Sequence, residues 1–274
     1  MKKFEKELGC TLFDRTKNSI TLNARGTAAL EHVNRILHDI TSFQAEMETF
    51  RGERKILRIL STAQVFLAFA IRRLLHEKGM QPLSATSTDQ RTGEASLRSG
   101  SADLLFSYVP VLQGDSFVCR KFCTETISVS MPKSCALARK AHVFFSDLDR
   151  MEVLHGSQAS WGDFSNLVIQ RQTQAGITTH SALMLSEPIM LGLREELHVL
   201  YYTSSFCEER MQPERFSGSN RVVRLLEDDL ARIPVYMTYP VKKAGMVEPF
   251  LAWLEKAIAD FPQEAQEPAA RSRA

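Results

Sequence analysis

The chain has 274 residues, a hydrophobic fraction of 44%, a charged fraction of 24% and a formal net charge of +2, values typical of a globular protein with one to three domains. No stretch approaches the roughly 18 consecutive apolar residues of a membrane-spanning helix, so the pattern excludes that class. No apolar segment follows the lysines of MKKFEKELG, so we expect no secretory signal and a cytoplasmic protein without a membrane partner.

The first 23 residues predict the end of a helix followed by a basic hairpin. Phe4 and Leu8 lie four residues apart on one helix face, and Gly9 suits the position just after a helix end. The stretch RTKNSITL alternates around Asn18 as a β-hairpin does. Residues 1–28 carry six basic and three acidic side chains, which indicates a small nucleic-acid-binding module, although a solvated basic surface is the alternative.

A long helix is predicted over residues 24–52, with Asn23 as its N-cap. Its apolar residues recur at alternating steps of four and three, the heptad pattern of a helix that packs against a partner helix. The sequence before it is too short to supply a core, so we favour dimerisation over packing within its own domain. The predicted dimerisation residues are Val33, Ile36, Ile40, Phe43, Met47 and Phe50.

From Ile56 onwards, strand-like and helix-like stretches alternate, which predicts an α/β body with largely parallel sheets. The tail at 263–274 has almost no large apolar residue and is expected to be disordered. The predicted strands are ILRILS, ADLLFSYVP, ETISVSMP, EVLHGS, LHVLYYTS, VVRLL and IPVYMTYP, and the predicted helices include AQVFLAFAIRRLLHEKG, TGEASLRSG and MVEPFLAWLEKAIADF.

Motifs of catalysis are missing from the sequence. It has no GxGxxG, P-loop, HExxH or GxSxG, and no histidine has a partner at metal-ligand spacing. We therefore expect no catalytic residue, no metal and no cofactor, and an enzyme is the weaker hypothesis. The five cysteines are scattered, which favours a reducing compartment. Cys119 and Cys123 fall about 13 Å apart along a predicted strand, as buried thiols or, less favoured, as a redox or metal pair.

The stretch KKFEKELGCTLFDRTKNSITLNARGTAALEHVNRIL closely resembles the end of the winged helix-turn-helix and the start of the linker helix in LysR-type transcriptional regulators. Asn23 stands where the family has Thr, and Arg25 replaces a small residue. Weaker matches follow at LRSGSADLLFSY, VSMPKSCALARKAHVFFSDLDRMEVL and YPVKKAGMVEPFLAWLEK. The residues that fit the N-terminal pattern are Leu8-Gly9, Leu12-Phe13-Asp14-Arg15, Leu22 and Gly26.

The resemblance implies a periplasmic-binding-protein-like effector domain of two α/β subdomains, joined by two crossovers, with a small-molecule cleft between them. We expect a partial winged helix-turn-helix at 1–23, a linker helix at 24–52 and the effector domain at 53–262. Within the effector domain, subdomain I is expected at 53–132 and 223–262, and subdomain II at 133–222. The motifs Leu-Pro and Phe…Tyr-Pro of the family's first effector strand and helix are missing here, so the ligand class is not inherited.

In the family, about thirty residues that include the front of the base-reading helix precede KKFEKELG. We therefore expect the chain as written to keep phosphate contacts while base readout is impaired. An internal Met as the apparent start is favoured over a truncated variant, since Phe4 and Leu8 would otherwise form an uncovered apolar face.

The resemblance also places candidate site residues. Arg15 is the strongest candidate for a DNA phosphate contact, with Lys17 on the wing, and the further DNA-binding candidates are Lys2, Lys3, Lys6 and Arg25. Effector contacts are expected where strands end and helix N-termini offer free N–H groups. Those candidates are Ser61, Thr62, Ser107, Ser157 and Thr203, for each of which a plain cap or turn role is equally open.

The sequence thus predicts a ligand-responsive, DNA-binding transcriptional regulator of the LysR type that associates as a dimer or tetramer. Its partners would be double-stranded DNA and a small-molecule effector of unknown identity. The alternative is a cytoplasmic small-molecule-binding or dimerisation protein that does not read DNA.

Overall fold

The computed structural model describes residues 2–15, 20–26, 29, 32–33, 36, 40, 56–75, 83–156, 158–181, 184–185, 196–207, 210 and 216–260. The chain divides into two compact units. Residues up to Lys55, together with Arg98–Ser101, form the N-terminal unit, and the rest of the chain forms the main unit.

The N-terminal unit consists of a short helix, α1 (Lys2–Leu8), and a hairpin of strands β1 (Phe13–Arg15) and β2 (Ile20–Leu22). The Glu5 carboxylate ties the helix to the hairpin, because its Oε1 accepts the backbone N–H groups of Leu12 at 2.7 Å and Phe13 at 3.2 Å. Asn23 Oδ1 accepts the N–H of Gly26 at 2.9 Å, which is the predicted N-cap. The predicted helix end and hairpin are confirmed, and Gly9 has a φ of +69°, as a residue after a helix end often has.

Part of the predicted dimerisation seam lies in the described residues. Val33, Ile36 and Ile40 are all helical, Val33 is half-buried, and the exposed fractions of Ile36 and Ile40 are 56% and 48% within one chain. Phe43, Met47 and Phe50 lie outside the described residues, as does Lys17 of the predicted wing.

The main unit is built on one mixed sheet with the order β4-β3-β5-β11-β6-β9-β7-β8, and β10 also pairs with β6. The strands are β3 (Leu57–Ser61), β4 (Leu83–Ser87), β5 (Leu104–Ser107), β6 (Phe117–Pro132), β7 (Val153–Gly156), β8 (Met184–Leu185), β9 (Leu200–Ser204), β10 (Arg221–Leu225) and β11 (Arg232–Pro240). The helices are α3 (Gln64–Leu74), α4 (Gln90–Ser99), α5 (Gln158–Gln174) and α8 (Ala244–Ala259), with 3-10 turns at Ala136–Arg139, Phe145–Leu148, Asp229–Ala231 and Val241–Lys243.

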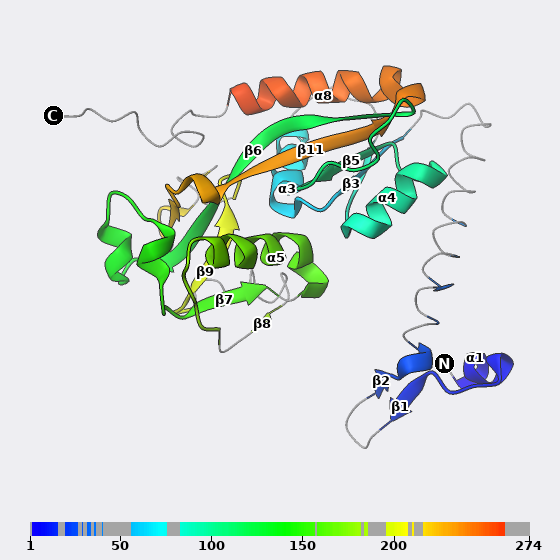
Figure 1. Ribbon diagram of the computed structural model, residues 1–274, viewed down its shortest axis with the longest axis horizontal. Helices are drawn as coiled ribbons and strands as arrows, with labels where there is room; N and C mark the ends of the chain where they lie inside the picture. Colours follow the sequence, from blue (N-terminus) through cyan, green and yellow to red (C-terminus); the bar gives the residue numbers. More distant parts are fainter. Residues whose placement is uncertain are drawn as a thin grey trace. The chain divides into compact units, whose positions relative to one another are not determined.

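The long strand β6 runs through two halves of this sheet, as Figure 1 shows. Its residues up to Thr126 pair with β11, and those from Ile127 onwards pair with β9 and β10. The return passage runs from β10 into β11. We use the name subdomain I for the elements on one side of these passages, which are β3, β4, β5, α3, α4 and α8, and the name subdomain II for β7 to β10 and α5 on the other side.

The sheet is mixed, which corrects the expectation of largely parallel sheets. β3 is parallel to β4 and β5, and β7 is parallel to β8 and β9. β6 and β11, however, are antiparallel to each other and to β5, β9 and β10, because each is a passage between subdomains rather than part of a βαβ unit. The edge strand β4 was not anticipated, since LSATS is only half apolar and its burial is partial.

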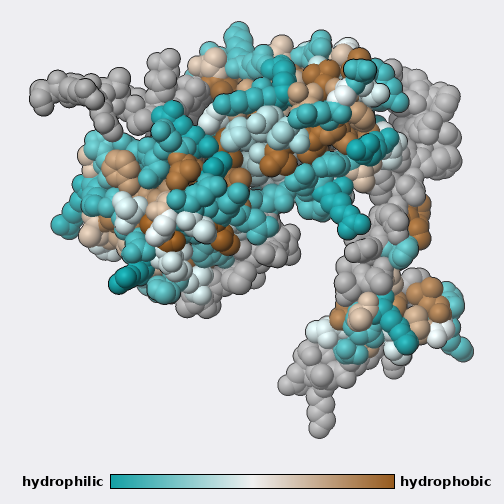
Figure 2. Space-filling model, in the orientation of Figure 1, coloured by the Kyte–Doolittle hydropathy of each residue, from teal (hydrophilic) through white to brown (hydrophobic). Residues whose placement is uncertain are grey.

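The core of the main unit extends across both subdomains. Phe66 of α3 packs edge to face on Phe106 of β5, with ring centroids 5.1 Å apart, and on Phe206, which follows β9, at 5.4 Å. Phe69 packs on Phe206 at 4.8 Å. Such aromatic pairs contribute roughly 0.5–1.5 kcal/mol each beyond their burial. Figure 2 shows hydrophilic side chains over most of one face, and no helix of the described chain is long and apolar enough to span a membrane.

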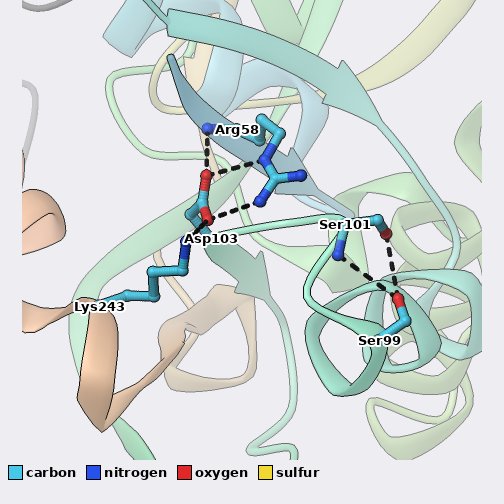
Figure 3. Close-up of polar contacts among 5 residues, drawn as sticks. All are labelled: Arg58, Ser99, Ser101, Asp103 and Lys243. Carbon is cyan, nitrogen blue, oxygen red and sulfur yellow. Dashed lines mark hydrogen bonds and ion pairs between the residues drawn. The ribbon is translucent and has the colours of Figure 1, made fainter. Parts of the chain in front are cut away.

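A buried carboxylate fixes the start of β5 in subdomain I (Figure 3). Asp103, whose side chain is 1% exposed, accepts two hydrogen bonds at 3.0 Å from the Arg58 guanidinium and one at 3.0 Å from the Arg58 backbone N–H. Lys243, before α8, places its Nζ 3.2 Å from Asp103 Oδ1. Burial alone raises the pKa of Asp103, but the hydrogen bonds and charges of Arg58 and Lys243 outweigh it and hold this pKa below its usual value.

The turn that precedes Asp103 in the sequence is also hydrogen-bonded (Figure 3). Ser99 donates its hydroxyl to Ser101 Oγ at 3.2 Å, and Gly100 has a φ of +80°, which an L side chain adopts only with strain.

We predict that Asp103→Asn lowers the free energy of unfolding by about 3 kcal/mol, because the change leaves two cationic groups without their buried counter-charge. Urea denaturation followed by far-UV circular dichroism measures this loss. The matched control is Arg120→Gln, which removes the exposed pair between Arg120 and Glu255 at 2.9 Å and should change stability by no more than about 0.5 kcal/mol.

The stabilisation that Asp103 provides also depends on pH. The folded-state pKa of Asp103 lies below its ordinary value of 3.8, so its stabilisation is present above that pH and is lost as the pH falls through the lowered pKa. Equal stability of Asp103→Asn and the wild type at pH 7 would contradict the role of this cluster.

Candidate functional site

A pocket of about 170 Å³ lies between the two subdomains. Subdomain I contributes the ends of β3 and β5, which are neighbouring parallel strands and therefore end at the same edge of the sheet. Subdomain II contributes one face of α5. The lining residues are Thr62, Gln90, Ser107, Tyr108, Val109, Asp163, Asn166, Leu167 and Gln170.

Two of the predicted effector residues line this pocket together. Thr62 follows β3, and its backbone N–H donates to the Phe106 carbonyl at 2.9 Å, which fixes it beside β5. Ser107 ends β5, and its hydroxyl donates to the Val109 carbonyl at 2.7 Å. The structure therefore brings Thr62 and Ser107 to one wall, as expected for residues at the C-terminal ends of adjacent strands.

The other predicted effector residues do not line the pocket. The Ser61 hydroxyl donates to the Ala63 carbonyl and accepts the Ala63 N–H, both at 3.0 Å, so Ser61 forms a turn before α3. Thr203 is buried within β9, where it pairs with Ser128 of β6. Ser157 lies outside the described residues.

Asp163 of α5 supplies the negative charge of the pocket. Burial and the nearby charge of Asp89 raise the pKa of Asp163, while hydrogen bonds from the Gln90 backbone N–H and the Thr62 side chain oppose that rise. Asp89 itself caps α4, since it accepts the Thr92 N–H at 2.9 Å and the Thr92 hydroxyl at 2.7 Å. Asp163 Oδ2 is buried and has no hydrogen-bond partner among the described residues.

A second buried acid lies behind the pocket wall, on β6 just before that strand changes subdomain. Glu125 is fully buried, and it accepts the hydroxyl of Tyr108 at 2.9 Å and that of Ser204, from β9, at 3.4 Å. Burial raises the pKa of Glu125 from 4.5 to about 7, although these two hydrogen bonds act in the opposite direction. Glu125 therefore connects a pocket residue, a crossover strand and subdomain II.

Sequence reasoning missed both acids. Asp163 carried no recognisable signal, because the helix that places it was not delimited in advance. Glu125 did carry one, since the strand period puts it on the same face as Ile127, Val129 and Met131, all fully buried. A carboxylate on the apolar face of a strand is unusual enough to mark a candidate site.

A second hollow, of about 480 Å³, lies on subdomain I along α3 and the edge strand β4. Its walls are mainly apolar, and Leu75 at one end is 77% exposed. The residues that line it are Gln64, Leu67, Ala68, Ile71, Arg72, Leu75, Leu83, Ala85 and Ser87.

The predicted DNA-contact residues fall on α1, the hairpin and the start of the next helix. Lys6 and Arg25 are exposed, Lys2 and Lys3 belong to α1, and Arg15 ends β1 opposite Ile20. In the described part of the chain, no group of three or more His, Cys, Asp or Glu side chains could hold a metal ion. Cys119 and Cys123 are half-buried and unpaired as a disulfide.

A family model, a relative of known role and several solved structures match the chain. Residues 49–191, more than half of it, match the family model of the LysR substrate binding domain. The HTH-type transcriptional regulator ClcR of Pseudomonas putida is 30% identical over 138 residues, which are 48% of this chain and 46% of ClcR. The matched region thus spans about half the length of that relative.

Solved structures share the fold at low sequence identity. CbnR in complex with its target DNA matches with a TM-score of 0.61 at 16% identity, over 95% of this chain and 88% of that one. Full-length BenM matches with a TM-score of 0.58 at 16% identity, over 98% and 88%. The reduced OxyR regulatory domain from Pseudomonas aeruginosa matches with a TM-score of 0.56 at 14% identity, over 73% and 97%.

The family model covers the strands and the helix that build the pocket, from β3 to α5. The relative ClcR is a transcriptional regulator. The chain belongs to the LysR family of transcriptional regulators.

Proposed function

We propose that this chain is a cytoplasmic transcriptional regulator that binds a small-molecule effector in the pocket between subdomains I and II and binds double-stranded DNA through its N-terminal unit. The observation that carries the proposal is the pocket itself. Its polar walls come from both subdomains, so a ligand that contacts Thr62 and Ser107 on one side and α5 on the other favours one relative arrangement of the two.

In this proposal, the crossover strands β6 and β11 transmit the change in the relative arrangement of the two subdomains. Tyr108 lines the pocket and donates to Glu125, which lies on β6 next to the point where β6 changes partners. A ligand that moves α5 towards β5 therefore acts on a strand shared by both subdomains. Hinge closure of this kind shifts populations in proportion to the ligand's preference for the closed form.

The N-terminal unit supplies the DNA contacts in this proposal. The basic side chains on α1 and the hairpin suit phosphate oxygens, which position a protein on the duplex without reading its sequence. CbnR, which shares the fold, has been solved with its target DNA, and that similarity supports a DNA-binding role here.

The proposal includes self-association as a dimer through residues 24–52 and as a tetramer through the main units. Ile36 and Ile40 are exposed along the predicted seam within one chain. The apolar hollow along α3 and the edge strand β4 is a second uncovered surface, and unpaired strand edges favour association.

The alternative function, a ligand-binding or dimerisation protein that does not read DNA, shares the pocket and the seam. It differs only in the N-terminal unit. A DNA-binding measurement therefore separates the two functions.

We predict that the chain binds duplex DNA with an affinity that falls as salt rises, and that Arg15→Ala reduces the slope of log K against log salt by about 0.9, the contribution of one phosphate contact. Fluorescence anisotropy with labelled promoter duplex and random duplex measures both slopes. Arg139→Ala, an exposed arginine of the main unit, is the control and should leave the slope unchanged. Salt-independent or undetectable binding to both duplexes would favour the alternative function.

The seam is tested by Ile36→Glu combined with Ile40→Glu. Charges buried between two helices destabilise their association, so the dimer dissociation constant should rise at least about tenfold. Sedimentation velocity over a concentration series gives this constant. The substitution of Ile169, an exposed apolar residue of α5, by Glu serves as the control. An unchanged dimer constant in the seam variant would place the interface elsewhere.

Glu125→Gln should remove a pH dependence of stability. Below pH 4.5 the acid is protonated in both states; between pH 4.5 and 7 only the unfolded state ionises, so stability falls as the pH rises and stays low above 7. A pKa of about 7 corresponds to a loss of about 3 kcal/mol for the ionised group.

Glutamine keeps an acceptor for Tyr108 without the charge. Urea midpoints at pH 5 and pH 8 should therefore separate for the wild type and lie closer together for the variant. Identical pH profiles for the two proteins would show that burial does not perturb Glu125.

A further inference from the structure

The hydroxyl groups at the pocket already donate their hydrogens to the protein. Ser107 donates to the Val109 carbonyl at 2.7 Å, Tyr108 donates to Glu125 at 2.9 Å, and Thr62 forms its side-chain hydrogen bond with the Asp163 carboxylate. A hydroxyl has one hydrogen and two lone pairs, so each of these groups can only accept a further hydrogen bond. These groups therefore present acceptors to a ligand.

The Asp163 carboxylate adds a charged acceptor to the pocket lining. Its Oδ2 is buried and makes no hydrogen bond within the described residues. A partly buried carboxylate without a counter-charge is unfavourable, so a cation that contacts this carboxylate from the pocket stabilises it.

The described lining residues carry charge of one sign. Among those the structure describes, none is a lysine, arginine or histidine, and Asp163 is the acid. Asp89 lies near enough to add to the negative potential at Asp163. A carboxylate ligand would meet this charge without a counter-ion, whereas a cation would compensate it.

The remaining lining residues indicate the chemistry of the uncharged part of the ligand. Val109 and Leu167 provide apolar surface, and the volume of about 170 Å³ suits a small molecule. Asn166 and Gln170 on α5 can each accept as well as donate.

We propose that the effector of this chain is a small organic cation, an ammonium or amidine-type group on a compact apolar body, whose N–H groups bind the Asp163 carboxylate and the acceptor hydroxyls of Thr62 and Ser107. This inference builds on the proposed function, because it names the chemical class of the ligand that the pocket between the subdomains takes.

Two probes of matched shape and opposite charge test the proposal. Benzylammonium and benzoate are titrated into the whole chain by isothermal calorimetry, with thermal unfolding as a second readout. Benzylammonium should bind at least about tenfold more tightly than benzoate, since a hydrogen bond to a charged partner is worth about that factor. It should also raise the Tm, because it binds only the folded state.

Variants assign the effect to the pocket. Asp163→Asn should weaken benzylammonium about tenfold or more, and Gln170→Glu, which adds a carboxylate to the same wall, should strengthen it severalfold. Asp115→Asn removes an exposed acid from a turn away from the pocket lining and should leave both affinities unchanged. The Tm of each unliganded variant shows that it is folded.

The cation preference and the regulator function fail on different results. Tighter binding of benzoate, or weak binding of both probes that neither variant changes, would overturn the cation preference. Promoter binding measured on the same preparation decides the regulator function independently, so a benzoate-selective chain that still binds the promoter would remain a regulator with an anionic effector.

Discussion

The antiparallel pairing of β6 with β11 is the constraint on which the main unit depends. Both strands pass between the subdomains, so every helix and strand of one subdomain is attached to the other through this pair. The ladder shifts its register between Val235 and Tyr236, where Phe122 is the extra residue on β6. A bulge bends the strand that contains it, and here it lies just before the crossover. The pocket exists because the two strands hold α5 opposite the ends of β3 and β5.

Three carboxylates in this unit show how environment, rather than residue type, decides the charge. Asp103 is buried with a guanidinium and an ammonium group, which keeps its pKa low and fixes β5 to β3 and to the start of α8. Glu125 is buried and accepts hydrogen bonds from two hydroxyl groups, and its burial raises its pKa to about 7. Asp163 lies between these cases, because hydrogen bonds from Thr62 and Gln90 oppose the rise in its pKa, while its Oδ2 has no hydrogen-bond partner among the described residues. The ion pairs of Asp103 stabilise the fold, whereas Asp163 is placed to bind a ligand.

The sequence allowed the N-terminal hairpin, the helix cap at Asn23 and most strands of the main unit to be predicted, because each depends on local periodicity or on a cap. It also placed Thr62 and Ser107 correctly at strand ends. The mixed direction of the sheet could not be predicted, since β6 and β11 read as ordinary strands and only their long-range pairing reveals two crossovers. Asp163 could not be predicted either, because its role depends on where α5 packs in three dimensions.

The central claim is that the pocket between the subdomains takes a ligand at Asp163. A crystal structure of the chain with benzylammonium tests this claim most directly. We expect the ligand nitrogen within hydrogen-bonding distance of the Asp163 carboxylate and close to the hydroxyls of Thr62 and Ser107. An empty pocket, or a ligand bound elsewhere on the chain, would contradict this.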